Sequence, residues 1–207
     1  MQLFNQVNKF KKFFAGLIAL VVLTGCSQVG SGVSIGESEV SSEQIQMYVD
    51  EIMTERAKVD TSQMQLDSGA VLVRTQAQFQ IISVVLDQII ADKKITVTPA
   101  DVAARRAEIV NQVGGEDQMP KALVGIGLAP SNLERYLKII LISERLYEVV
   151  IAEGATEESA GQAVTKLVTD AAKKLGVNVN SRYGKWNELT ATIDEADNTD
   201  GAVTPVP

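Results

Sequence analysis

The feature that most constrains this chain is its one cysteine, Cys26, which stands directly after an apolar stretch near the N-terminus. A basic patch at residues 9–12 comes first, and residues 13–23 are then almost wholly apolar. This order, closed by small residues, is typical of a secretory signal. The apolar run has about 11 residues, whereas a membrane-spanning helix needs about 20. We therefore expect residues 1–25 to be a signal peptide and the mature chain to lie outside the cytoplasm.

The residues around the cysteine also resemble a modification motif. Leu23-Thr24-Gly25-Cys26 is similar to the bacterial lipobox, and that resemblance implies a diacylglycerol on the thiol of Cys26. The alternative is an ordinary signal peptide that happens to hold a cysteine. Residues 26–32 are small and polar, and we expect them to be a tether between the lipid and the fold.

Composition then excludes several classes of function. A single cysteine permits no intramolecular disulfide, so stability must come from the packed core. The formal charge moves from −7 to −10 when the three lysines of the signal leave, and an acidic body does not suit nucleic acid. Histidine, the commonest metal ligand and general base, is absent. We expect no metal, no cofactor and no nucleic acid partner.

Capping signals and apolar periodicity predict a mostly helical mature domain. Hydroxyl caps and prolines mark the expected helix starts, and glycines mark most of the ends. The expected helices run from the Ser41 cap to about Lys58, over Val71–Ile90, from the Thr98 cap to Val113, over Met119–Gly127, from a capping box at Pro130–Glu134 to about Ala152, and from Thr156 to Gly176.

The segment Val71–Ile90 is apolar on most sides, which is typical of a helix buried in a core. A membrane span is the competing interpretation. Arg74, three glutamines and Asp87 interrupt the segment too often for a span, so we expect a core helix.

Short alternating segments lie at the two ends of the mature chain. Residues 33–35 and 177–180 read as strands, with a turn or second strand at 181–186. We expect an α+β fold, predominantly α-helical, in which a small antiparallel strand pair joins the N- and C-terminal ends. This domain covers residues 33–193, and the acidic, proline-containing tail at 194–207 is expected to be disordered.

The order of these elements resembles the N-terminal domain of SurA-like periplasmic chaperones and PrsA-like foldase lipoproteins. The resemblance is carried by Ile95–Val102, which opens a helix after a long apolar one, and by Ser131–Leu137, which opens a later helix. Val179–Trp186 is similar to the closing motif of SurA-like lipoproteins, with Ser181 in place of the usual proline. The resemblance spans roughly residues 33–190 and rests mainly on the order of these motifs.

The resemblance implies a membrane-anchored chaperone for unfolded exported polypeptides that works without ATP. It does not extend to prolyl isomerisation, because only Glu153-Gly154-Ala155 separates the last two helices where those families insert a parvulin domain. That domain would need on the order of a hundred residues. The alternative function is an accessory or scaffold lipoprotein that docks one dedicated partner in the cell envelope.

Candidate residues for peptide binding lie in the weak helix that contains two glycines. Apolar side chains on a segment of low helix stability suit a surface that adapts to many clients. The candidates are Met119, Leu123, Ile126 and Leu128. The alternative is that these side chains complete the core, as apolar residues at helical spacing usually do.

Other residues give weaker signals. Tyr183 and Trp186 fit a core edge better than a peptide-binding pair. The adjacent acids Glu157-Glu158 do not face each other on a helix, so we expect no catalytic residues and no enzyme activity.

The anchor gives the first prediction. Two acyl chains hold a protein firmly on a membrane, whereas one holds it only marginally. Replacing Cys26 with Ala should therefore move the protein into the soluble fraction after cell fractionation. If the variant still pellets with membranes after a high-salt wash, the lipid on Cys26 is not the anchor.

Overall fold

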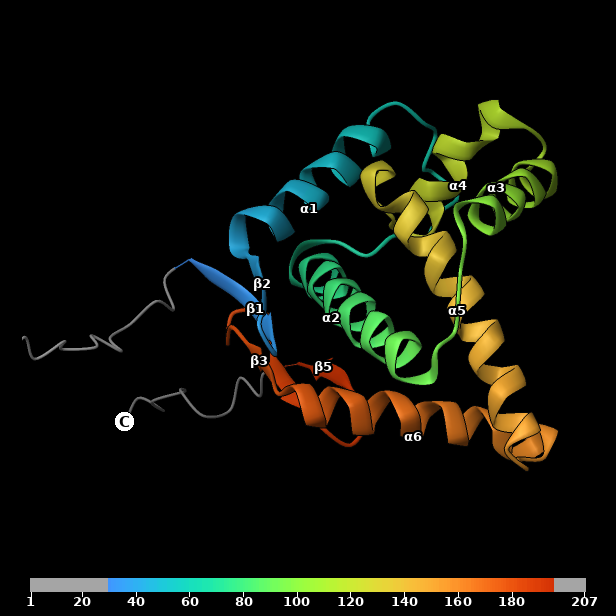
Figure 1. Cartoon of the computed structure of the whole chain (residues 1–207). Coiled ribbons are helices and arrows are strands. Elements are labelled where there is room, and N and C mark those ends of the chain that lie inside the picture. The colour runs from blue at the N-terminus through green and yellow to red at the C-terminus, as the bar shows by residue number, and fades with distance from the viewer. Residues whose placement is uncertain (1–29, 196–207) are drawn as a thin grey trace, which may run out of the picture.

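The computed structural model describes residues 30–195, so the expected signal peptide, Cys26 and most of the acidic tail lie outside the described residues. Six α-helices, two short 3-10 helices and five strands make up this part of the chain, which confirms the predominantly helical α+β fold. Figure 1 shows α2 (Gly69–Lys93) in the middle of the domain. Around it lie α1 (Ser42–Arg56), α5 (Leu133–Ala152), α6 (Glu157–Leu175) and the strands.

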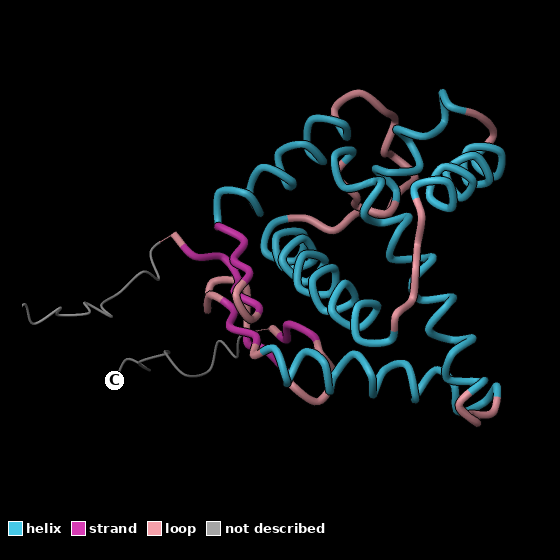
Figure 2. The backbone as a smooth tube through the Cα atoms, in the orientation of Figure 1, coloured by secondary structure: helices cyan, strands magenta, loops and turns pink. Residues whose placement is uncertain are grey.

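The ends of the domain meet in a three-stranded antiparallel sheet of order β2-β1-β3 (Figure 2). Its strands are β1 (Ser31–Ile35), β2 (Ser38–Ser41) and β3 (Val177–Val179). Val33 pairs with Val40 on one side and Val179 on the other, so the predicted joining of the two ends is confirmed. The sequence did not predict β2, and β1 begins at Ser31, within the stretch expected to be tether.

Helix α2 is the core of the domain. Its buried apolar residues pack against the sheet, α5 and α6 in one large cluster. By length and composition α2 could cross a membrane, and it is the one helix among residues 30–195 for which this holds. Here the other elements cover it, and its buried Gln76 donates to the Gly127 carbonyl across 3.0 Å.

The helix starts are largely those predicted. The Ser41 hydroxyl accepts from the Gln44 amide, and Thr98 forms a capping box with Asp101 at the start of α3 (Pro99–Val113). The Thr98 amide, helped by its hydroxyl and by Arg145 on α5, holds the pKa of Asp101 below its ordinary value. This carboxylate therefore both caps α3 and ties it to α5.

One predicted cap is wrong. Residues Pro130–Asn132 form a 3-10 helix (η2), and α5 begins at Leu133 with no side-chain bond from its N-cap Asn132. Ser131 does not cap α5 because it lies inside η2, one residue before the N-cap position; its hydroxyl and its amide instead donate to Glu51 on α1, at 2.9 Å and 3.2 Å. A tertiary contact thus replaces the expected local one.

A second small sheet closes the C-terminal end. β4 (Lys185–Asn187) and β5 (Thr192–Asp194) form a hairpin that the sequence did not predict beyond a possible strand. Gly184 precedes it with a φ of +131°, where a Cβ would come within 2.1 Å of the Asp194 carbonyl oxygen. Asp194 and Glu195, which pairs with Arg74, belong to the fold and not to the expected tail.

The side chain of Gln78 fastens this hairpin to α2. Its amide nitrogen donates to the Ala191 carbonyl at 2.8 Å, and its amide oxygen accepts from the Ile193 amide at 2.7 Å. Ile193 and Ala191 are both buried in the main core cluster. One side chain therefore bonds to two backbone groups of the hairpin at a partly buried junction.

We predict that Gln78→Ala destabilises the domain by about 1–3 kcal/mol, because it removes two partly buried hydrogen bonds that join α2 to the backbone of the hairpin. Gln88→Ala on the same helix is the matched control, since Gln88 donates only to the Asp92 side chain. Urea denaturation of both variants measures the difference. Equal midpoints for the two would show that Gln78 does not hold the hairpin.

Candidate functional site

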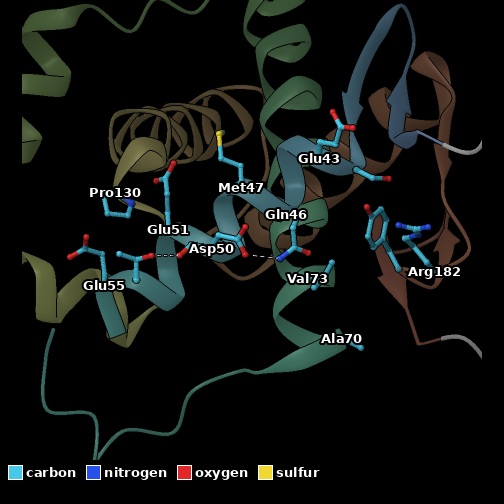
Figure 3. Close-up of a pocket in the computed structure, with 13 residues that line it drawn as sticks. Glu43, Gln46, Met47, Asp50, Glu51, Glu55, Ala70, Val73, Pro130 and Arg182 are labelled. Atoms are coloured by element: carbon cyan, nitrogen blue, oxygen red, sulfur yellow. Dashed lines mark hydrogen bonds between the residues drawn. The ribbon is translucent and has the colours of Figure 1, made fainter. Parts of the chain in front are cut away.

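An open groove of about 970 Å³ runs beside α1 and is called the α1 groove here (Figure 3). Its walls come from α1, the first turn of α2, η2 and the turn before β4. In Figure 3, Pro130 and Arg182 lie on opposite sides of the view, with α1 between them. The lining residues are Ser42, Glu43, Gln46, Met47, Asp50, Glu51, Thr54, Glu55, Ala70, Val73, Pro130, Arg182 and Tyr183.

The periodicity of α1 explains why this helix has an exposed apolar residue in the groove. The helix buries Ile45, Val49 and Ile52 together with Tyr48, at the spacing of a single face. Met47 falls off that face and is 46% exposed. With Ala70 and half-buried Val73 of α2, it gives the groove an apolar character.

Charge is unevenly distributed along the groove. Four carboxylates on α1 line it, from Glu43, Asp50, Glu51 and Glu55, whereas Arg182 is its single cationic lining residue. Of these four acids, only Glu55 has an ion-pair partner among the described residues, Lys58 at 2.7 Å. The groove is therefore acidic as well as apolar.

Neutral neighbours hold two of these carboxylates in place. Asp50 accepts from the Gln46 amide at 2.8 Å, one turn earlier on the same helix. Glu51 accepts from the hydroxyl and amide of Ser131. These bonds orient the carboxylates and leave their charges uncompensated.

The open shape and the apolar lining of the groove are suited to binding. Between residues 30 and 195, no three His, Cys, Asp or Glu side chains come together closely enough to hold a metal ion. The groove acids are spread along the helix axis, where the Ser131 hydroxyl donates to Glu51 and Lys58 pairs with Glu55. An open, elongated groove can accommodate a length of polypeptide.

The structure corrects the sequence-based choice of binding residues. Met119, Leu123 and Leu128 are buried and form a core cluster between α4 (Met119–Gly125) and α3. Their partly buried partners are Phe79, Ile109, Val110, Val113, Leu133 and Tyr136. These three residues complete the core and are not an exposed surface, because α3, α5 and Phe79 of α2 pack against them.

Ile126 differs from the other three candidates. It is 55% exposed at the C-cap of α4, just before Gly127 turns the chain with a φ of +63°. It does not line the α1 groove. The four candidates are therefore not brought together on one accessible surface.

The aromatic pair has the structural role that the sequence favoured. Tyr183 is buried in the main core cluster, and Trp186 packs against that cluster from β4. Tyr183 also lines one end of the α1 groove.

Sequence reasoning missed the residues of the groove. Met47 falls outside the apolar face of α1, but single exposed apolar residues are common on protein surfaces and do not mark a site by themselves.

Burial now predicts different outcomes for two neighbouring substitutions. Leu123→Ser should lower the free energy of unfolding by about 2–4 kcal/mol, because it removes a buried aliphatic side chain and adds a hydroxyl. Ile126→Ser should change it by less than about 0.5 kcal/mol, as surface substitutions usually do. Thermal and urea denaturation compare the two. Similar losses in both variants would contradict the placement of Ile126 on the surface.

Comparisons with known proteins add no assignment. No family model, no curated protein and no solved structure matches this chain.

Proposed function

We propose that this chain is a membrane-tethered, ATP-independent chaperone-like lipoprotein that binds unfolded or extended exported polypeptides in the α1 groove. The observation that carries the proposal is the groove itself, about 970 Å³ in volume and lined by exposed Met47 and by Ala70, Val73 and Pro130. An unfolded chain exposes apolar side chains that a folded protein buries, and these side chains can bind to the apolar surface of an open groove.

The chemistry of the groove favours many clients over one sequence. Methionine is flexible and polarisable, and surfaces that use it tolerate changes in the bound sequence. Met47 is supplied by a well-capped helix, so the adaptable side chain stands on a fixed support. Binding and release would then follow from modest affinity alone, with no nucleotide and no prolyl isomerase activity.

The position of the groove suits a lipid-tethered protein. The amide of Ser42, a groove residue, donates to the Gly30 carbonyl at 3.1 Å. Cys26 precedes Gly30 by four residues, a length of chain that spans at most about 14 Å. With its lipid on Cys26, the protein would hold this end of the groove close to the membrane surface, where exported chains emerge.

A dedicated partner remains the second candidate. Asp50 and Glu51 are oriented by Gln46 and Ser131, and a fixed set of carboxylates is what one specific partner would need. An accessory lipoprotein of this kind would bind one envelope protein and leave unrelated unfolded proteins to aggregate.

Two methionines of α1 give a matched test. Met47→Ser should weaken suppression of aggregation about two- to fivefold, because it removes apolar contact area from the groove. Met53→Ser is the control, since Met53 is 51% exposed on the same helix but does not line the groove. Light scattering of two unrelated denatured proteins, diluted into buffer with each variant, measures the effect.

Each outcome of this experiment separates the candidates. Suppression of both clients by the unmodified protein, weakened only by Met47→Ser, supports the chaperone proposal. If the unmodified protein suppresses aggregation of neither client, the chaperone proposal is contradicted and the dedicated partner is favoured. Equal effects of the two substitutions would remove the α1 groove as the binding site.

A further inference from the structure

The uneven charge of the α1 groove indicates which polypeptide segments it prefers. A second concave surface provides the contrast, because there Asp87 is paired with Lys138 at 2.7 Å and with Arg135 at 3.8 Å. In the α1 groove, Glu43, Asp50 and Glu51 have no cationic partner among the described residues. These carboxylates can be neutralised by cations from solvent or by cationic side chains of a bound partner.

The carboxylates keep capacity for further hydrogen bonds. Each ionised carboxylate can accept about four. Asp50 accepts one from the Gln46 amide, and Glu51 accepts two from Ser131. Lysine and arginine side chains can therefore reach these groups without displacing the bonds that orient them.

The spacing of the acids matches an extended chain better than a compact cation. Glu43 and Glu55 are twelve positions apart on one helix, a rise of about 18 Å. A strand that rises about 3.3 Å per residue covers this length with roughly six residues. Met47 lies between the acids along the helix, so apolar and cationic contacts would alternate over the same stretch.

We infer that the α1 groove selects extended segments in which lysine or arginine flank apolar residues, and that it disfavours segments of equal hydrophobicity that carry acids. This inference rests on the proposed function and adds the chemical class of the client. The apolar contacts supply the general affinity, and charge complementarity supplies the ranking among clients.

Three labelled peptides of about twelve residues, roughly twice the length that the groove acids span, test the inference with the full mature chain. They share the same leucines and differ only in carrying lysine, serine or glutamate at the other positions. Fluorescence anisotropy should give the order lysine, serine, glutamate in affinity. Raising the salt should compress this order, because the Debye length falls from about 10 Å at 0.1 M to about 3 Å at 1 M.

A double substitution locates the effect. Glu43→Gln with Asp50→Asn should weaken binding of the lysine peptide about three- to tenfold and leave the serine peptide unchanged. Glu148→Gln with Glu158→Gln is the matched control. Glu158 also lies in the first turn of a helix, Glu148 also lies within one, both are exposed, and neither lines the groove.

The outcomes distinguish this inference from the proposed function. Equal binding of all three peptides, or equal effects of the two double substitutions, overturns the charge selection while the chaperone proposal stands. Binding of none of the peptides, together with no suppression of aggregation, removes the proposed function and this inference with it.

Discussion

The burial of α2 is the constraint on which the rest of the structure depends. A helix of 25 residues that is apolar on most of its sides must be covered by other elements over much of its surface. The sheet, α5 and α6 cover its apolar residues in the main cluster, and α1 covers its first turns through Leu72. Two of its polar side chains act as connectors, with Gln76 bonded to Gly127 and Gln78 bonded to the hairpin.

The features that could be predicted from the sequence are those that local chemistry determines. The Thr98–Asp101 and Thr156–Ser159 boxes involve residues three apart, and the structure has both. The features that could not be predicted depend on distant partners. Ser131 fits a capping box by its neighbours in sequence, but it lies inside η2 and donates to Glu51, 80 positions away. Likewise, the hairpin of β4 and β5 is held by Gln78, more than a hundred positions earlier.

The candidate site illustrates the same limit. Composition identified Met119, Leu123, Ile126 and Leu128 as apolar residues on a weak helix, and such residues fit a core or a surface equally well. Packing against α2, α3 and α5 decides that three of them are buried. The α1 groove could not be located from the sequence because its walls come from four segments that adjoin only in three dimensions. Its acids were visible as single residues, but their lack of cationic partners is a property of the assembled fold.

The pairing of β1 with β3 also has a consequence for the order in which the chain folds. Ser34 pairs with Asn178, so β1 cannot form this pairing until β3, which lies 144 positions later in the sequence, has been synthesised. The sheet cannot close during synthesis until that late segment is available, whereas the helices between can form earlier from local contacts. Closing a loop of this length is an entropic barrier that slows folding, as for other proteins rich in distant contacts. The sheet would thus be complete only after residues 177–179 have been synthesised.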